Sequence, residues 1–498
     1  MELKQKILKL FAIGYILALL LPTPILAQIT FERTYGSNDY EEANSVIQTT
    51  DLGYIVAGFT EPYDQFSDVY LVKTDSLGNI QWTKTYGSSG RDEASSIVQT
   101  SDGGYVITGA AGLYFEDVYL IKMNSFGDTL WTRRYGGGSF DEGKAVIQTT
   151  DGGYIVAGYT DSYGAGFRDV YLIKTDSLGE ALWTRTYGDT NSEVGNSVLQ
   201  TQDGGYVIAG WKWFPHLNQT KVYLIKTNSF GDTLWTRTYG GGPGNSIAQA
   251  SDGGYLIVGE TITSGGGNVD VYLLRIDSYG DTLWMRRYGG IAVDEGCSIA
   301  QTSDGGHIIT GWTWSYGAGR EDVYLIKIDS LGDTLWTRTY GGANDEEGHS
   351  VTQTVDGGYI IAGYTYSYGE GLSDIYLIKT DTLGTVSGVD ESGDYLVPKG
   401  FPLIENYPNP FNSATLIRYH LPAISSQLFA ASLKVYNILG EEVRTLVDEK
   451  LKPGRYEAVW DGRDNRGKEV ASGVYLCRLK VLGDRCKVVK TRKMVLIR

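Results

Sequence analysis

Carboxylate side chains recur at one place in a repeating unit of this sequence. Acidic residues stand five and six positions after a Tyr-Gly pair, as in Asp141-Glu142, Asp294-Glu295 and Glu346-Glu347. Paired carboxylates perform the acid and base steps of glycoside hydrolysis, and carboxylate oxygens are also ligands that Ca²⁺ prefers. A pair that recurs in every copy of a repeat is more often a structural feature of the repeat or a solvated rim. The candidate residues for ligand contact are Glu142, Glu295 and Glu346.

Aromatic residues gather in another connection of the same unit, where copies differ from one another. Exposed aromatic rings beside carboxylates suit the recognition of a sugar or a peptide. The alternative is that these rings fold back to cap the unit. The candidates are Trp211, Trp213, Trp312, Trp314, Tyr316, Tyr364 and Tyr366.

Other reactive residues form no recognisable catalytic pattern. The four histidines are scattered, and none of the usual zinc-ligand spacings is present. We expect no cofactor, with Ca²⁺ as the open alternative. Cys477 and Cys486 flank a predicted hairpin turn at 482–484. The sequence therefore leaves two alternatives, free thiols or a disulfide between them after export.

Seven copies of one unit carry these residues. An Asp-Gly-Gly turn or its equivalent begins at Asp51 and recurs at intervals of 51, 49, 52, 49, 52 and 52 residues. In the third copy, four strand-like runs occupy 144–149, 154–159, 170–175 and 182–187. Four antiparallel strands repeated seven times predict an all-β fold, a seven-bladed β-propeller over residues 28–386.

The ends of the array predict a closed ring. The seventh copy stops near Val386 without its fourth strand, while 29–36 supplies that strand at the start of the chain. Pairing the two removes two exposed sheet edges.

The turns after the first and third strands are uniform and share one face. The other two connections vary and share the opposite face, where ligands are expected to bind.

Residues 1–27 have the basic start, apolar centre and small-residue end of a secretory signal peptide. Cleavage is predicted between Ala27 and Gln28, with an uncleaved anchor as the alternative. No later segment is long and apolar enough to span a membrane.

Residues 28–389 hold 22 basic and 45 acidic residues, a net charge of −23. This acidic balance argues against binding nucleic acid.

The third turn carries a resemblance to a known repeat. Asp-x-x-Gly-x-x-x-Trp, as in Asp329 to Trp336, resembles the tryptophan-docking repeat of quinoprotein-type propellers. The resemblance implies that each tryptophan packs one blade against the next. It resembles the sialidase Asp-box only loosely, because Asp and Gly are one residue too far apart here.

Residues 387–402 break the period and are predicted to be a linker. Residues 403–498 are predicted to form a small immunoglobulin-like sandwich. The motifs Asn406-Tyr-Pro-Asn-Pro-Phe-Asn412, Trp460-Asp-Gly462 and Lys493 to Arg498 resemble a type A C-terminal sorting domain, similar to the immunoglobulin-like domain of flagellar hook-capping proteins. This resemblance implies recognition of 403–498 by the type IX secretion machinery, and a secreted or outer-membrane cell-surface location.

The leading hypothesis is a non-enzymatic binding module for an extracellular glycan or protein. The alternatives are a glycan-active hydrolase that uses carboxylates of the variable face, and a structural component of a surface layer.

Overall fold

The computed structural model describes the two folded regions of the chain. The predicted signal peptide 1–27, which includes Ala27, and the predicted linker 387–402 lie outside the described residues, so both stay predictions. No helix among the described residues has the length and apolar character needed to cross a bilayer. The described ranges are 28–63, 65–261, 269–386, 405–407, 409–421, 429–437, 440–452, 454–483 and 486–497.

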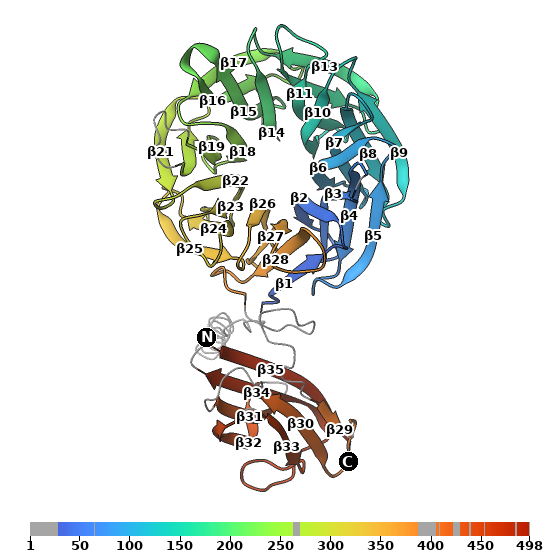
Figure 1. Cartoon of the computed structure of the whole chain (residues 1–498), viewed down its shortest axis with the longest axis vertical. Coiled ribbons are helices and arrows are strands. Elements are labelled where there is room, and N and C mark those ends of the chain that lie inside the picture. The colour runs from blue at the N-terminus through green and yellow to red at the C-terminus, as the bar shows by residue number, and fades with distance from the viewer. Residues whose placement is uncertain are drawn as a thin grey trace, which may run out of the picture.

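Seven four-stranded antiparallel sheets stand in a ring around a central opening, which confirms the all-β propeller prediction (Figure 1). Runs rich in β-branched and aromatic residues favour these strands. In six blades the strands follow chain order, from the opening outward. These blades are β2 (Tyr40–Gln48), β3 (Tyr54–Glu61), β4 (Asp68–Thr74), β5 (Ile80–Tyr86); β6 (Arg91–Gln99), β7 (Tyr105–Gly112), β8 (Asp117–Met123), β9 (Thr129–Tyr135); β10 (Asp141–Gln148), β11 (Tyr154–Thr160), β12 (Asp169–Thr175), β13 (Ala181–Tyr187); β14 (Glu193–Gln200), β15 (Tyr206–Phe214), β16 (Gln219–Thr227), β17 (Thr233–Tyr239); β18 (Gly244–Gln249), β19 (Tyr255–Glu260), β20 (Val271–Ile276), β21 (Thr282–Tyr288); and β22 (Asp294–Gln301), β23 (His307–Thr313), β24 (Asp322–Ile328), β25 (Thr334–Tyr340). A 3₁₀ turn, η1 (Pro215–Leu217), links β15 to β16.

The seventh blade joins the two ends of the propeller sequence, as predicted. It consists of β26 (Glu346–Gln353), β27 (Tyr359–Thr365), β28 (Asp374–Thr380) and, at its outer edge, β1 (Phe31–Tyr35). β1 pairs antiparallel with β28, with Phe31 opposite Lys379 and Tyr35 opposite Ile375. The N-terminal strand therefore completes the last blade.

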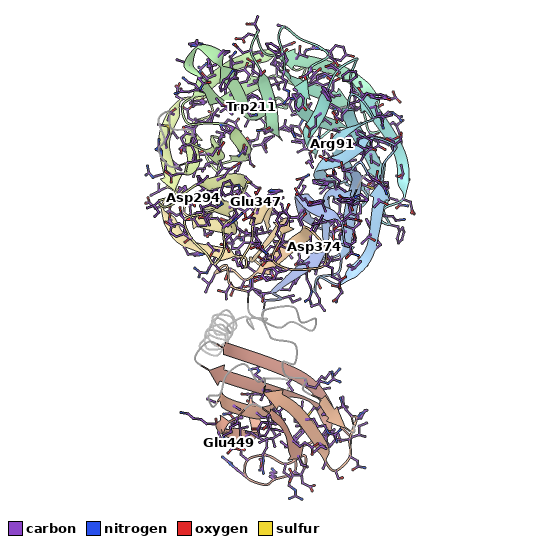
Figure 2. The ribbon with its side chains drawn as sticks, viewed as in Figure 1. Arg91, Trp211, Asp294, Glu347, Asp374 and Glu449 are labelled. Atoms are coloured by element: carbon purple, nitrogen blue, oxygen red, sulfur yellow. The ribbon has the colours of Figure 1, made fainter. Side chains whose placement is uncertain are left out.

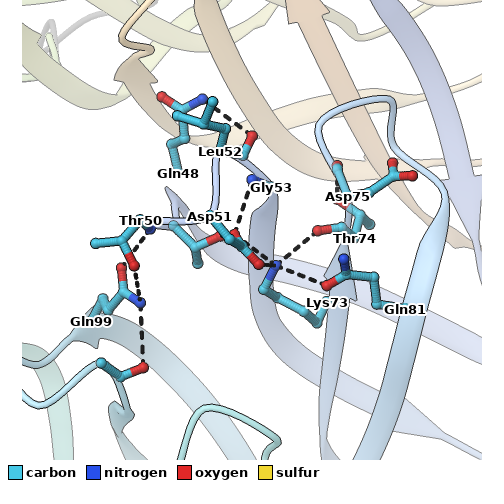
Figure 3. Close-up of polar contacts among 12 residues, drawn as sticks. Gln48, Thr50, Asp51, Leu52, Gly53, Lys73, Thr74, Asp75, Gln81 and Gln99 are labelled. Atoms are coloured by element: carbon cyan, nitrogen blue, oxygen red, sulfur yellow. Dashed lines mark hydrogen bonds and ion pairs between the residues drawn. The ribbon is translucent and has the colours of Figure 1, made fainter.

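In every blade a buried cation fastens the turn between the first and second strands to the third strand, and Figure 3 shows this contact in the first blade. In the first blade the Lys73 ammonium lies 2.9 Å from the Asp51 carboxylate and also donates to the carbonyl of Thr74. The same pair occurs in all seven blades, with Arg275 replacing lysine in the fifth. Burial raises the pKa of Asp102, but hydrogen bonds from Thr100 and Lys122 outweigh it and lower that pKa to about 2.

The fourth-strand tryptophans dock each blade on the next, as the quinoprotein-type resemblance implies. The Trp131 ring lies against Tyr154 of the following blade, with ring centroids 6.0 Å apart. Beside it, the Tyr135 hydroxyl donates to the carbonyl of Gly179, at 2.6 Å. The equivalent tyrosine bond occurs at all seven interfaces, including the one that Tyr35 makes to Gly78 across the closure.

The fourth-strand arginines contribute to the same contact. The Arg185 guanidinium lies over the Trp183 ring, 5.5 Å from its centroid, and equivalent stacking recurs in four other blades with tryptophan. One of them also forms an ion pair with the next blade, since the Arg133 guanidinium lies 2.7 Å from the Glu180 carboxylate. These arginines stabilise the docking.

Replacing Gly179 with alanine is expected to destabilise the propeller more than replacing Gly152. Both glycines have positive φ, +77° and +83°. Each change therefore strains the backbone by about 1–2 kcal/mol. A Cβ at Gly179 would also lie 2.7 Å from the Trp131 ring, whereas nothing lies within 4 Å at Gly152. Urea unfolding of both variants isolates the contribution of docking, and equal losses would contradict tight docking at this turn.

The C-terminal region is an immunoglobulin-like sandwich of two sheets. One sheet has the order β29 (Glu405–Tyr407), β30 (Thr415–Leu421), β33 (Gly454–Trp460). The other has the order β32 (Glu442–Leu451), β31 (Phe429–Asn437), β34 (Gly473–Gly483), β35 (Cys486–Leu496). The fully buried Trp460 ring packs against Phe411 and Tyr475 between the sheets. Two predicted sorting motifs, those containing Phe411 and Trp460, therefore supply part of the core.

The disulfide alternative for Cys477 and Cys486 is wrong. β34 and β35 do form a hairpin, but its register places Cys477 opposite Arg492 and Cys486 opposite Gly483. The backbones of the two cysteines are thus separated by about 20 Å along the strands, far beyond disulfide reach. Cys477 is a free, buried thiol.

Candidate functional site

The mouth of the central opening lies on the face that carries the variable loops, and it brings acidic and aromatic residues together. Each innermost strand enters from this face, and in six of the seven blades its second or third residue pairs with the second strand of the same blade. Most of these pairs join a glutamate to an aromatic ring. The pairs are Glu42–Phe59, Glu93–Ala110, Glu142–Tyr159, Val194–Trp211, Glu295–Trp312 and Glu347–Tyr364, and we call them the mouth ring.

The two carboxylates of each predicted pair serve different purposes. Asp141 is fully buried and accepts hydrogen bonds from the Gly137 backbone and the Ser162 hydroxyl, at 2.9 and 2.6 Å. Glu142, the next residue, points to the other side of the strand and is half-buried at the mouth. Alternation along the strand therefore separates the pair, so the two carboxylates do not form one acid/base couple.

A cavity of about 410 Å³ opens at the mouth. Its wall combines amide, carboxylate, ammonium and imidazole groups with one phenyl ring, which provides donors and acceptors in close proximity. The lining residues are Asn44, Phe59, Glu93, Ser95, Glu142, Lys144, Asn196, Asn245 and His349.

Side chains two positions after the mouth glutamates connect adjacent blades. The Asn44 amide donates to the carbonyl of Ala94, at 2.9 Å, and the Asn196 amide donates to Gly244, at 3.0 Å. His349 takes the same place in the seventh blade, with Nδ1 lying 3.0 Å from the carbonyl of Ala43. These bonds hold the cavity wall in a fixed shape.

Both ring nitrogens of His349 face hydrogen-bond acceptors, an arrangement that favours the protonated ring. Nδ1 faces a carbonyl oxygen and Nε2 lies 3.1 Å from the Glu347 carboxylate, and both of these partners only accept. Burial lowers the pKa of His349, but the bond and the charge of Glu347 outweigh burial and raise it above 6.5. The protonated ring of His349 is therefore the cationic partner of the Glu347 carboxylate at the mouth.

Two further glutamates near His349 are held close to neutrality. Burial, followed by the charges of Glu260 and Glu347, raises the pKa of Glu295 to about 7. Burial and a shared hydrogen bond with Glu347 raise the pKa of Glu321 to about 7. Burial raises the pKa of Glu347 as well, but the hydrogen bond and the charge of His349 outweigh burial and lower it. Glu321 and Glu347 therefore have split pKa values, which allow one carboxyl group to donate a proton while its neighbour stays ionised.

Replacing His349 with asparagine is expected to remove one pH-dependent contribution to stability. The folded pKa of His349 is raised above 6.5. Its contribution is therefore fully present below the unfolded value and is lost as pH rises through the folded value. Asparagine keeps the inter-blade bond, as Asn44 does. Unfolding midpoints at pH 6 and pH 9 test this, and an unchanged difference between them in the variant would contradict it.

The structure distributes the predicted site residues over three environments. Glu142 lines the cavity, where the Lys144 ammonium lies 2.6 Å from it, and Glu295 belongs to the mouth ring. Glu346 was predicted wrongly, since it is fully buried and accepts bonds from Gly342, Thr365 and Ser367. It holds its loop in place, as Asp141 does.

Four predicted aromatic residues lie on two neighbouring blades, two on the sixth and two on the seventh. The Trp312 and Trp314 rings are 6.5 Å apart, and the Tyr364 and Tyr366 rings are 5.6 Å apart. The Tyr364 hydroxyl donates to Glu347, and Trp314 donates to Glu321. This group links exposed aromatic surface to the acidic side of the mouth.

The other three aromatic candidates lie elsewhere. Tyr316 donates its hydroxyl to the carbonyl of Gly289, at 2.8 Å, so it holds a loop. Trp211 and Trp213 are half-buried on the fourth blade. Figure 2 shows Trp211 and Glu347 on opposite sides of the central opening. The seven predicted rings therefore do not form one binding surface.

Several mouth residues were missed by sequence reasoning. Asn44, Lys144, Asn196, Asn245 and His349 share one position, two residues after the mouth glutamate or its equivalent. This shared position in the repeat is the signal that could have identified them. It was not apparent because the type of residue at the position changes from blade to blade. Among the described residues, no group of three or more His, Cys, Asp or Glu side chains is arranged to hold a metal ion.

Residues 413–484 match the family described as the FlgD Ig-like domain, in agreement with the predicted similarity to hook-capping proteins. No curated protein matches the sequence.

Solved structures similar to the chain include PorZ, described as an essential bacterial surface component of the type-IX secretion system of Porphyromonas gingivalis. The identity is 14%, the TM-score 0.43, and the match covers 93% of this chain and 60% of that one. A Dyadobacter fermentans protein of unknown function has 12% identity and a TM-score of 0.40, over 72% of this chain and 99% of that one. Puromycin hydrolase has 13% identity and a TM-score of 0.43, over 82% and 63%. At these values the similarities carry no statement about activity or partners.

Proposed function

We propose that this chain is a secreted or cell-surface binding module whose propeller binds an extracellular glycan at the mouth cavity. The observation that carries the proposal is the composition of the cavity wall. Asn196 and Asn245 provide amides, Glu93 and Glu142 provide carboxylates, and Phe59 provides an apolar surface. Sugars present hydroxyl groups that both donate and accept, together with apolar faces that pack on aromatic rings.

Binding to a glycan array by the mature full-length protein tests this proposal. Replacing Ser95 with tryptophan places a large ring in the cavity wall and is expected to weaken binding at least tenfold. Ser125→Trp adds the same side chain at an exposed turn of the opposite face and should leave binding unchanged. If the Ser95→Trp variant bound the glycan normally, the binding site would lie outside the mouth cavity. A protein ligand, or a purely structural role in a surface layer, becomes the better hypothesis if no glycan binds.

A hydrolase is the second candidate, favoured by the pKa values of about 7 at Glu295 and Glu321. Release of reducing sugar from a glycan that binds would reveal this activity. Glu295→Gln and Glu321→Gln are expected to abolish the release if these groups act as proton donors. Release that persists in both variants would exclude them from the chemistry.

The delivery of the protein is proposed from the C-terminal motifs and the FlgD Ig-like match. Residues 403–498 would be recognised by the type IX secretion machinery, which would place the propeller outside the outer membrane. Deleting 403–498 is expected to retain the protein in the periplasm. Normal surface delivery without these residues would contradict a sorting role.

A further inference from the structure

The wall of the mouth cavity runs around the axis of the ring. Its lining residues belong to the innermost strands of six blades, together with Phe59 from the second strand of the first blade (Figure 1). Side-chain hydrogen bonds join the innermost strands at five of the seven blade junctions. The residues that make these bonds are Asn44, Ser95, Asn196, Asn245 and His349. Because the wall encircles the cavity, a chain molecule reaches it along the axis, with its end first.

Positive and negative charges are balanced within this wall. The four charged lining residues are two carboxylates and two basic groups, and each lies within 3.1 Å of an oppositely charged partner. The two carboxylates are largely buried, with side-chain exposures of 16% at Glu93 and 17% at Glu142. The ion pairs are Glu93 with Arg91 at 2.8 Å, Glu142 with Lys144 at 2.6 Å, and His349 with Glu347 at 3.1 Å.

A charged sugar in the cavity would have to separate one of these ion pairs. If a ligand carboxylate took the Lys144 ammonium, the Glu142 carboxylate would be left unpaired beside a new negative charge. A ligand ammonium that took Glu142 would leave Lys144 in the equivalent position. Leaving one member of a buried charge pair without its partner weakens binding strongly. Sugar hydroxyl groups both donate and accept, so they can bond to both members of a pair without separating them.

Four further carboxyl groups near the mouth do not change this balance. They do not line the cavity, and burial raises the pKa of each, to about 7 for Glu295 and Glu321. A carboxyl group held towards its neutral form provides little attraction for a cationic ligand. The four groups are Glu42, Glu260, Glu295 and Glu321.

Building on glycan binding as the proposed function, we propose that the mouth cavity binds the uncharged end of a glycan chain. The cavity volume of about 410 Å³ lies near the lower end of the roughly 300–1,000 Å³ that is usual for small-molecule sites, which suits about one or two sugar units. Chains that end in a uronic acid, a sulfated sugar or a sugar with a free amine are expected to bind weakly.

The glycan array, extended with oligogalacturonides as anionic probes and chitosan oligomers as cationic probes, tests the charge preference of the mature full-length protein. Neutral chain ends are expected to bind about tenfold or more tightly than either charged probe, in binding that Ser95→Trp weakens. Equal or tighter binding of a charged probe would overturn this proposal and leave the proposed function standing. Binding of no glycan at all would overturn the proposed function, and this proposal with it.

The variant Glu142→Gln tests whether the ion pairs set the preference. It frees the Lys144 ammonium and is expected to raise the binding of oligogalacturonides, relative to neutral glycans, by about tenfold or more. Glu180→Gln is the matched control, because it breaks the ion pair with Arg133 at an outer turn of the third blade and should leave this ratio unchanged. An unchanged ratio in Glu142→Gln would overturn the proposal.

The binding stoichiometry tests whether the cavity takes a chain end. Isothermal titration with short and long chains of the same neutral glycan is expected to give one bound propeller per chain at every length. A number of bound propellers that rises with chain length would show that internal segments bind, and it would overturn the proposal.

Discussion

Replacing Phe31 with alanine is expected to lower the free energy of unfolding by about 3–5 kcal/mol, the usual cost of removing a buried aromatic ring. Phe31 is 3% exposed and packs edge-on against Tyr54 of the first blade, with ring centroids 5.8 Å apart. It also lies over Gly78, where the other interfaces have a tryptophan over the equivalent glycine. The ring is therefore closed by the same docking contact that joins every other pair of blades.

Urea unfolding followed by tryptophan fluorescence measures this loss. Ile29→Ala is the matched control, because Ile29 is 40% exposed just before β1. A substitution at such an exposed position should cost no more than about 0.5 kcal/mol. If Phe31→Ala were no more destabilising than Ile29→Ala, the N-terminal strand would not be part of the folded ring in solution.

Lowering the pH from about 6.5 to about 4 is expected to destabilise the propeller through His307. This residue replaces the tyrosine found at the start of the second strand in every other blade, and it is 2% exposed. Neither ring nitrogen has a hydrogen-bond partner among the described residues. Burial, reinforced by the charges of Lys327 and Arg275, lowers the pKa of His307 to about 4.

The direction of this change in stability follows from how many protons the folded and the unfolded chain bind at each pH. Above pH 6.5 the imidazole is neutral in both the folded and the unfolded chain, so His307 contributes no pH dependence. Between pH 6.5 and 4 the unfolded chain takes up a proton that the folded chain refuses, and stability falls. The loss reaches about 3 kcal/mol near pH 4, from about 1.36 kcal/mol for each unit of pKa shift.

The pair Arg275→Lys and His307→Tyr restores the residues that most other blades carry, and it is expected to abolish this share of the acid sensitivity. His307→Tyr alone tests whether Arg275 leaves room for the larger ring. Unfolding free energies measured from pH 4 to pH 7 give the comparison. Identical pH profiles for the wild type and the double variant would show that His307 does not titrate as its surroundings require.

The repeat period, strand count and ring closure were predictable from the sequence because each depends on local patterns. The Asp-Gly-Gly turn and the Trp-Thr-Arg-Thr-Tyr-Gly strand occur in contiguous stretches, and the displaced copy at 29–36 revealed the closure. The roles of the carboxylates were harder to predict. Asp141 and Glu142 look like a pair in the sequence, but one-residue alternation sends them to opposite sides of a strand.

The cavity residues of the mouth and the positions of the two cysteines could not be predicted from the sequence, for a different physical reason. The mouth depends on which side chains of seven separate blades meet, and no local pattern encodes that meeting. Asn44 belongs to the first blade and His349 to the seventh, and yet both line one cavity. For Cys477 and Cys486, the hairpin was predicted correctly, but its register pairs Cys486 with Gly483 at the end of β34 and pairs Cys477 with Arg492, far along the strand.

The pairing of β1 with β28 sets the order in which the propeller can be completed during synthesis. The first strand of the propeller finds its partner only after Asp374–Thr380 has emerged, whereas the first six blades each close locally. Long-range pairing of this kind is slow because the chain must first lose the entropy of a large loop. A partly synthesised chain therefore holds β1 unpaired until the seventh blade has been made, and this interval is when it is most exposed to aggregation and to proteases.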